Sequence, residues 1–258
     1  MKIKAVIFDW AGTTVDYGCF APVRTFIEVF KEYGIDVTMD ETRKPMGMLK
    51  WDHIKTMLAM PNIKAQWEKK YGRASQDSDI DEMHNKFTAN LLKILDQYCE
   101  LKPYAREAVE TLRATGIRIG STTGYTDEMM NIVLPKAKDN GYSPDYWITP
   151  NSVNNCGRPY PYMIFRNLEA MQIKDVRSVL KVGDTISDIE EAKAAGVLAV
   201  GILEGSSLMG LSEEEYKNLN VEEQEALIKK LTREYREAGA DFILYNLKEL
   251  PALVQSIA

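Results

Sequence analysis

The stretch IKAVIFDWAGTT, residues 3–14, decides the fold of this 258-residue chain. It opens with a mostly apolar run, residues 3–8, which stops at Asp9. Short apolar runs that stop at a polar residue are typical of strands buried on both faces of a parallel sheet. We therefore predict a first strand over residues 3–8, with Asp9 at its carboxyl end.

The later part of the chain repeats this composition between helical patterns. Further strands are predicted over residues 117–121, 178–182, 198–202 and 242–245. Helices are predicted between them, over residues 104–115, 126–138, 162–171 and 187–194. Strands that alternate with helices predict an α/β fold, here a Rossmann-like parallel sheet core with right-handed crossovers.

Residues 17–99 carry no convincing strand pattern, and their apolar residues recur at helical spacing instead. The simplest interpretation is a helical cap domain, residues 19–99, which is inserted after the first strand and covers the carboxyl edge of the sheet. The core would then comprise residues 1–18 and 100–258. An elaborate crossover without a role is the alternative.

The composition excludes several classes of function. The formal charge is −6 and the basic residues are scattered, so neither nucleic acid nor an anionic membrane is an expected partner. Three widely spaced cysteines, Cys19, Cys99 and Cys156, suggest neither a disulfide framework nor a zinc cluster. With no signal-peptide pattern and no apolar stretch near the roughly 20 residues that span a bilayer, the expected location is cytoplasmic. The Glu-rich residues 212–237 are expected to form a solvated helix pair.

Three carboxylates are expected to meet at one edge of the sheet. Asp9 follows the first strand, and Asp184 and Asp188 follow the strand over residues 178–182. Ligands of open parallel sheets bind outside the carboxyl ends of the strands. Carboxylates gathered there repel one another unless a cation such as Mg²⁺ lies between them. The alternative is helix capping, above all for Asp188.

A small polar turn follows the second predicted strand. It reads Ser-Thr-Thr-Gly over residues 121–124 and precedes a helix. The Thr123 hydroxyl and the Gly124 backbone N–H are suited to donate to a phosphate group. Because the turn lies at the same edge as the carboxylates, it is a candidate phosphate site.

These motifs together resemble those of the haloacid dehalogenase superfamily. They are Asp9-x-Ala-Gly-Thr-Thr, the turn at 121–124, and Gly-Asp-Thr-x-Ser-Asp at 183–188. The resemblance implies that Asp9 attacks phosphorus and forms an aspartyl phosphate, with Mg²⁺ neutralising the phosphoryl oxygens. It also implies a ligand set for the metal: Asp9, the Ala11 carbonyl and Asp184, with Asp188 in support.

Two departures from the superfamily pattern narrow the function. Most of its phosphatases carry a second Asp two residues after the nucleophile, where this chain has Ala11. The general acid for an alcohol leaving group is therefore absent. The usual lysine of the third motif is replaced by Arg158, whose planar fork matches two oxygens of a phosphonate.

Both departures match the phosphonoacetaldehyde hydrolases, or phosphonatases, which the chain resembles over its whole length. The most diagnostic string is RKPMGMLKWDH, residues 43–53. In that family the lysine that matches Lys50 condenses with the aldehyde of the substrate. The resulting iminium accepts the electron pair of the broken C–P bond, so that the carbon leaves as a neutral enamine and needs no acid at Ala11.

The remaining expectations follow from this chemistry and helical spacing for Lys50, His53 and Met46, and from the resemblance for Cys19, Tyr125 and the homodimer. Lys50 must be a free amine, which burial under the cap would favour. His53 is expected on the same helical face, where it could shuttle protons. Met46, Cys19 and Tyr125 are expected near the substrate phosphonoacetaldehyde, and family members are commonly homodimers.

Two other functions stay open at this point. An ordinary phosphatase or phosphomutase of the superfamily would share the fold, although Ala11 argues against it. A catalytically silent binding protein would also share it. The intact set of phosphate and metal residues argues against that alternative; the set is Asp9, Thr123, Arg158, Asp184 and Asp188.

Overall fold

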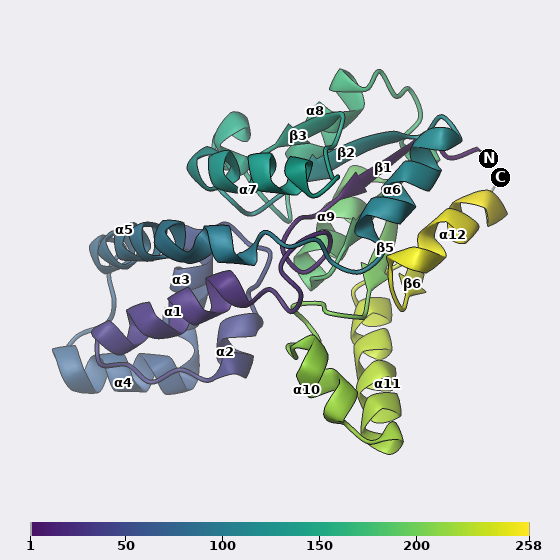
Figure 1. Ribbon diagram of the computed structural model, residues 1–258. Coiled ribbons are helices and arrows are strands. Elements are labelled where there is room, and N and C mark those ends of the chain that lie inside the picture. Colours follow the sequence, from purple (N-terminus) through teal and green to yellow (C-terminus); the bar gives the residue numbers. More distant parts are fainter. Residues whose placement is uncertain (1, 258) are drawn as a thin grey trace.

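The computed structural model describes residues 2–257, so Met1 and Ala258 of the expected core lie outside the described residues. Its centre is a six-stranded sheet in the order β3-β2-β1-β4-β5-β6, and every pairing is parallel (Figure 1). The prediction of an α/β fold with a parallel sheet is confirmed. The strands are β1 (Ala5–Phe8), β2 (Arg118–Thr122), β3 (Tyr146–Ile148), β4 (Val179–Gly183), β5 (Leu198–Ile202) and β6 (Phe242–Leu244).

Helices cover both faces of this sheet. In β1, Val6 and Phe8 face one apolar cluster, whereas Ala5 and Ile7 face the other, as alternation along a strand requires. The first face packs against α6 (Ala105–Ala114), α7 (Asp127–Asp139) and α12 (Leu250–Ser256). The second packs against α8 (Tyr162–Ala170), α9 (Ile186–Ala195) and α11 (Val221–Glu237).

The strand β3 is a correction to the sequence analysis, which predicted five strands. It has three residues, and it pairs only with β2 at the edge of the sheet. Tyr146 and Trp147 remain partly exposed, so the segment never forms the apolar run that marks the other strands. An edge strand this short leaves little periodicity to detect.

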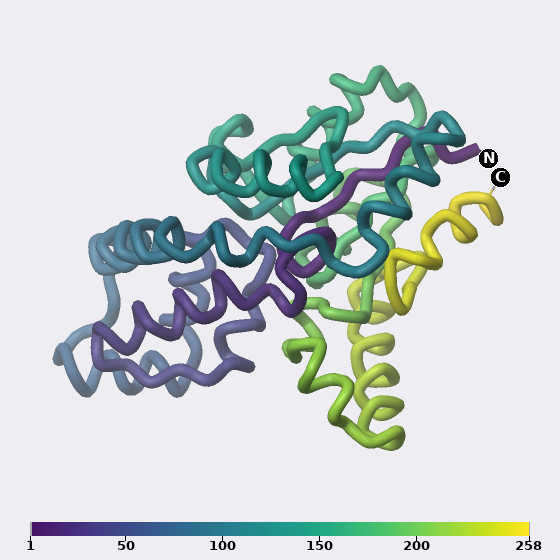
Figure 2. The backbone as a smooth tube through the Cα atoms, viewed as in Figure 1, coloured from purple at the N-terminus to yellow at the C-terminus, as the bar shows by residue number. Residues whose placement is uncertain are grey.

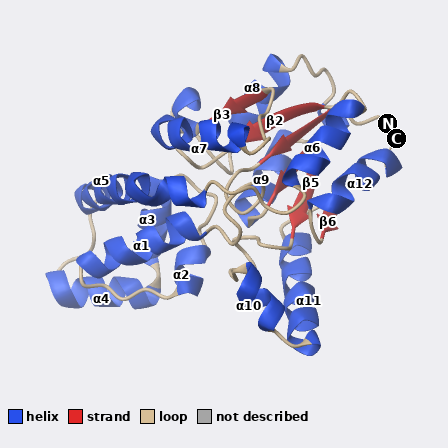
Figure 3. Cartoon of the chain, in the orientation of Figure 1, coloured by secondary structure: helices blue, strands red, loops and turns tan. Residues whose placement is uncertain are grey.

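Between β1 and β2 the described chain forms helices and no strand, as predicted. We refer to residues 20–98 of this stretch, which end before α6, as the helical insert. Figure 3 shows it as a group of blue helices beside the red sheet, and Figure 2 shows the chain leaving the core and returning to it. Its helices are α1 (Phe20–Glu32), α2 (Met39–Arg43), α3 (Lys50–Ala59), α4 (Pro61–Tyr71), α5 (Asp77–Ile94) and the 3₁₀ helix η1 (Leu95–Tyr98).

The two crossings between core and insert run side by side. Val15 in the first crossing forms an antiparallel bridge with Leu101 in the second. The Asp16 N–H donates to the Glu100 carbonyl at 3.2 Å, which extends this pairing toward the insert. The Asp16 carboxylate accepts from two backbone N–H groups at the start of α1. The start of the insert is thus tied to both crossings.

The Glu-rich segment forms the expected helix pair, α10 (Glu213–Asn218) and α11. In Figure 1, α10 and the first part of α11 lie away from the sheet, whereas Leu231 and Tyr235 in the later part of α11 are buried. Over residues 2–257, none of the helices combines the length and apolarity that a membrane crossing demands. The three cysteines are free thiols.

Candidate active site

A small cavity lies where the helical insert meets the carboxyl ends of β1, β2 and β4. It collects residues that are far apart in the sequence and that come from both parts of the molecule. Nine of the residues predicted for the site line it, together with three further residues. The lining residues are Asp9, Ala11, Cys19, Pro22, Met46, Gly47, Lys50, Thr123, Gly124, Tyr125, Arg158 and Thr185.

Asp9 is held in this cavity by β1 and by the turn that follows it. Its backbone N–H donates to the Val182 carbonyl at 2.9 Å, which fixes it at the end of the strand. The Thr14 hydroxyl donates to the Asp9 carbonyl. The carboxylate is 5% exposed, and its Oδ1 lies 2.6 Å from Arg158 Nη2. The side chain is therefore oriented, while its other oxygen atom accepts no hydrogen bond from residues 2–257.

Asp184 and Asp188 lie beside Asp9, as the sequence predicts. One oxygen atom from each of the three carboxylates lies within 4.8 Å of the others. Burial raises the pKa of Asp184 well above its usual range, and the charges of Asp9 and Asp188 raise it further. A group of buried, mutually repelling carboxylates fits a divalent cation.

Two backbone features near Asp184 support the same fit. The Gly12 φ is +85°, and a Cβ at this glycine would overlap the Asp184 carboxylate. The Ala11 carbonyl, in a residue that lines the cavity, accepts no hydrogen bond from the described residues. Asp9, Ala11 and Asp184 thus provide hard oxygen ligands of the kind that Mg²⁺ selects.

Asp188 is engaged differently from the other two carboxylates. Its Oδ1 lies 2.7 Å from Lys181 Nζ and 3.0 Å from Arg158 Nη1, and its Oδ2 accepts from the Thr185 hydroxyl at 2.6 Å. Burial opposes ionisation, but the charges of Arg158 and Lys181 outweigh it and lower the pKa of Asp188. The lowered pKa favours the anionic form of Asp188, which pairs with Lys181 and Arg158, and its support of a metal ion stays a prediction.

Arg158 is the centre of this buried ionic cluster. Its Nε donates to Glu191 at 3.1 Å, and its Nη2 donates to Asp9 and to the Thr122 carbonyl. Burial tends to lower the pKa of Arg158, yet Asp188, Asp9 and Glu191 together raise it. The guanidinium is a fixed charge on the wall of the cavity. Arg158 lies in a loop, and its peptide bond to Pro159 is cis.

Sequence reasoning missed two buried charged residues behind Arg158. Lys181 lies in the middle of β4, fully buried, and its Nζ is 3.6 Å from Glu191 in α9. Glu191 also accepts from the Thr122 hydroxyl at 3.0 Å. A lysine inside an otherwise apolar strand signals a buried partner, and Glu191 follows Asp188 by one helical turn. These signals were available in the sequence.

The predicted phosphate turn faces the carboxylates across the cavity. The Thr123 hydroxyl oxygen accepts from the Tyr125 N–H at 3.1 Å, which leaves its own proton free to donate. A Cβ at Gly124 would lie 3.3 Å from the Gly47 and Met48 carbonyls of the insert. The glycine therefore lets the two parts of the molecule approach closely.

Lys50 enters the same cavity from the insert. It is the first residue of α3 and only 3% exposed. Within residues 2–257 its Nζ has no hydrogen-bond or ion-pair partner, and its neighbours are the rings of Tyr125 at 5.6 Å and Phe26 at 5.9 Å. Burial lowers the pKa of Lys50. The positive end of the α3 dipole acts in the same direction.

His53 lies behind Lys50 and does not line the cavity. Its ring is fully buried and stacks on Phe26 with centroids 3.9 Å apart, and its Nε2 lies 2.9 Å from the Thr42 carbonyl. Burial, and then the charge of Lys50, lowers the pKa of His53 well below its usual range. The ring is therefore neutral and packed as part of the insert.

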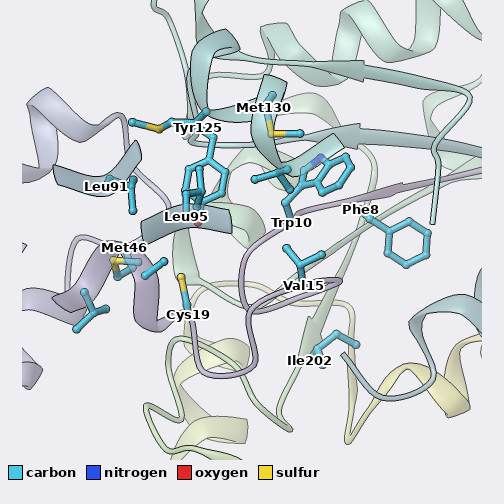
Figure 4. Packing of buried hydrophobic residues seen from close by; sticks show 14 of the residues in the cluster. Phe8, Trp10, Val15, Cys19, Met46, Leu91, Leu95, Tyr125, Met130 and Ile202 are labelled. Atoms are coloured by element: carbon cyan, nitrogen blue, oxygen red, sulfur yellow. The ribbon is translucent and has the colours of Figure 1, made fainter. Parts of the chain in front are cut away.

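The other three predicted residues contact the cavity. Figure 4 shows Cys19, Met46 and Tyr125 where the insert meets the sheet. All three are almost completely buried. Burial, then Asp16 and Asp184, raises the pKa of Cys19 well above its usual range, so the thiol is neutral.

Comparison with known proteins agrees with this geometry. Residues 3–196 match the family described as haloacid dehalogenase-like hydrolase. The chain is 50% identical to the phosphonoacetaldehyde hydrolase of Lysinibacillus sphaericus (strain C3-41), covering 100% of this chain and 96% of that protein. It is 44% identical to that of Bacillus cytotoxicus, covering 100% and 97%. A crystal structure of a phosphonoacetaldehyde hydrolase-like protein from Oleispira antarctica superposes with a TM-score of 0.96 at 34% identity, covering 100% of this chain and 93% of that one.

The fold, the three clustered carboxylates and the match over most of the chain place this protein among the haloacid dehalogenase-like hydrolases. Within that class, identity of 44 to 50% over the full chain is decisive. The chain belongs to the phosphonoacetaldehyde hydrolases. Because its relatives are enzymes, the chain is an enzyme and the alternative of a silent binding protein is set aside.

Proposed function

We propose that the chain cleaves the C–P bond of phosphonoacetaldehyde through an imine on Lys50 and an aspartyl phosphate on Asp9. One observation carries this proposal. A buried amine without a hydrogen-bond partner and a carboxylate that is held by an arginine line the same cavity, from opposite parts of the molecule.

The first step is condensation of the Lys50 amine with the substrate aldehyde, which releases water. The lowered pKa of Lys50 supports this role because only the neutral amine is a nucleophile. The rings of Phe26 and Tyr125 lie near its Nζ, and the residue is only 3% exposed, which favours the neutral amine. His53 is the predicted proton shuttle. Its place behind Lys50 supports at most an indirect part in this step.

In the second step the free oxygen atom of Asp9 attacks phosphorus while Arg158 holds the other oxygen. The C–P bond breaks, and its electron pair moves into the iminium to give an enamine. Protonation of the enamine carbon and hydrolysis of the imine release acetaldehyde. Hydrolysis of the aspartyl phosphate releases phosphate. Overall, one phosphonoacetaldehyde and one water give one acetaldehyde and one phosphate.

The surrounding residues support this sequence of events. Thr123 and Gly124 line the cavity and would donate to the phosphonate oxygens, and Arg158 would add a positive charge. Mg²⁺ held by Asp9, Ala11 and Asp184 would neutralise charge on the phosphonate and bring it to the nucleophile. The methyl group of Ala11 leaves no acid beside Asp9, which suits a leaving group that departs as a neutral enamine.

We further propose that the helical insert acts as a cap domain, residues 19–99, over a core of residues 1–18 and 100–258. Cys19, Met46 and Tyr125 would then enclose the substrate. The expected homodimer and the cytoplasmic location remain predictions, and light scattering on the purified protein tests the first.

The direct test is the detection of acetaldehyde and phosphate from phosphonoacetaldehyde, with and without Mg²⁺. We expect the two products in equal amounts and only in the presence of the ion. A faster release of phosphate from simple phosphate esters than from the phosphonate would instead support the phosphatase alternative.

A further inference from the structure

One arginine of the helical insert binds the core directly. Arg43 is the last residue of α2, and its Nη1 donates to the Gly18 carbonyl at 2.7 Å and to the Ser207 carbonyl at 3.0 Å. Gly18 belongs to the first crossing, and Ser207 follows β5 in the core. A single guanidinium therefore joins the insert, the crossing and the core.

The Ser207 backbone leads from this arginine to the candidate metal site. Its N–H donates to Asp184 Oδ2 at 2.7 Å, while its carbonyl accepts from Arg43. Ser207 is 1% exposed, so neither hydrogen bond has water as a ready substitute. A shift of Ser207 would change its contacts with the insert and with Asp184 at the same time.

The residues around Arg43 pack closely against its side chain. The guanidinium carbon lies 5.0 Å from the centroid of the Phe20 ring. Gly210 has a φ of +72°, and a Cβ there would lie 3.0 Å from Arg43 Nε. Gly47 in the following loop has a φ of +89°, and a Cβ there would overlap the Thr185 hydroxyl, next to Asp184. The loop after α2 thus fits closely against the residues that carry the carboxylates.

Few other side chains make hydrogen bonds between the insert and the core. Over the described part of the chain, there are two others. The buried Asp16 carboxylate accepts from the first N–H groups of α1, next to it in the sequence, and Lys136 pairs with Asp96 at 3.2 to 3.4 Å, where both residues are exposed. Exposed ion pairs contribute little to stability, whereas buried hydrogen bonds from a charged donor contribute more. Among the described residues, Arg43 is therefore the buried side chain of the insert that donates hydrogen bonds to the core.

We propose that Arg43 is a positioning residue that latches the helical insert onto the core and, through Ser207, holds Asp184 in place. This inference rests on the proposed function only in that catalysis requires Lys50 of the insert to face Asp9 of the core. Loss of the latch raises the fraction of molecules in which the cavity is open. That fraction sets both the access of reagents to Cys19 and the turnover of the enzyme.

The test compares Arg43→Met with Arg24→Met in the full-length protein. Arg24 is the matched control because it also lies over the Phe20 ring, at 5.5 Å, but its hydrogen bond to Tyr98 stays inside the insert. Each protein is alkylated with iodoacetamide for a series of times, and peptide mass mapping gives the rate at each cysteine. The partly exposed Cys156 is the internal reference.

We expect Cys19 in Arg43→Met to be alkylated about tenfold to a hundredfold faster than in the native protein, with a parallel loss of turnover. Arg24→Met should leave the Cys19 rate unchanged. Equal Cys19 rates in the two variants would overturn the proposal. An equal acceleration at Cys99, which is buried outside the cavity, would also overturn it, because it would indicate general unfolding.

If Arg43→Met does not fold, Arg43→Lys serves instead. This variant keeps the charge but loses the two-pronged guanidinium. The alkylation rate at Cys19 should therefore lie between the rate in the native protein and the rate in a fully open form. An alkylation rate equal to the native one would overturn the proposal. Alkylation of Cys19 requires no substrate. A failure of the imine chemistry at Lys50 would therefore leave this result unaffected, and the two ideas are tested separately.

Discussion

Arg158 Nη2 lies 2.6 Å from Asp9 Oδ1, so the expected nucleophile is held by the residue that was expected to hold the substrate. The arginine reaches Asp9 while Glu191 and Asp188 fix the rest of its guanidinium. The orientation of the attacking carboxylate is therefore built into a buried ionic cluster, and it does not depend on the arrival of the substrate.

Replacement of Arg158 by lysine should be damaging although the charge is kept. A lysine cannot bond Asp9, Asp188 and Glu191 together, and incomplete buried ion pairs cost several kcal/mol. We expect kcat/KM to fall by about a hundredfold or more, with changes in both kcat and KM. Steady-state kinetics measures this, and Arg166→Lys, an exposed residue paired with Glu169, is the control. Native values of kcat and KM in Arg158→Lys would show that the guanidinium geometry of Arg158 is not needed for catalysis.

Asp9→Asn should abolish the release of phosphate and leave the imine intact. The two side chains are nearly isosteric, but the amide cannot attack phosphorus, so turnover should fall on the order of 10⁴-fold or more. Borohydride should still trap the substrate on Lys50. Turnover near the native rate would show that another residue is the nucleophile.

The bound ion should stabilise the folded protein as well as activate it. Burial, Asp9 and Asp188 raise the pKa of Asp184, and a divalent cation relieves that repulsion only in the folded state. We expect Mg²⁺ to raise the melting temperature without substrate, and excess chelator to abolish turnover reversibly. In Asp184→Asn the shift in melting temperature should shrink or vanish. Full activity in chelator would remove the metal from the mechanism.

Lys50 should be the residue that forms the imine. Borohydride added with phosphonoacetaldehyde is expected to inactivate the enzyme permanently, and peptide mass mapping should find the adduct on Lys50. Lys50→Arg should abolish both trapping and turnover, because a guanidinium stays protonated and cannot condense with an aldehyde. Lys55→Arg is the control, since Lys55 lies exposed on the same helix beside Asp77. An adduct on another lysine would mean that the substrate or its site has been misread.

The pH dependence of trapping should report the burial of Lys50. Only the neutral amine reacts, so the trapping rate rises with pH through the pKa of Lys50 and levels off above it. Burial lowers that pKa, so the midpoint should lie below the ordinary value for lysine. A stopped-flow series across pH measures it. A midpoint at the ordinary lysine value would show that Lys50 reacts from an open, hydrated state.

The sequence was informative wherever local chemistry and strand periodicity coincide. Asp9 and Asp184 follow apolar strands, and parallel pairing of those strands brings the two carboxylates together. The helical insert followed from the lack of any strand pattern after β1. The edge strand β3 was not predicted because a partly exposed three-residue strand has no apolar run that could mark it.

Side-chain direction was less predictable. His53 was expected on the face of Lys50 because three residues nearly complete a helical turn. In the structure both side chains lie against the Phe26 ring, but only Lys50 lines the cavity, so a shared helical face does not place both residues at the site. Lys181 and Glu191 were missed because a buried charge is recognised only together with its partner.

The pairing of Val15 with Leu101 gives the molecule a modular construction. Residues bridged in this way lie about 5 Å apart, so the chain leaves and re-enters the core at practically one point. In the proposed mechanism the sheet, with Asp9, Arg158 and Asp184, would supply the chemistry at phosphorus, and the insert would supply Lys50 for the chemistry at carbon. A different set of helices spliced in at this point could bring another reactive group to an unaltered phosphoryl-transfer core, and only the latch residues would have to be matched again.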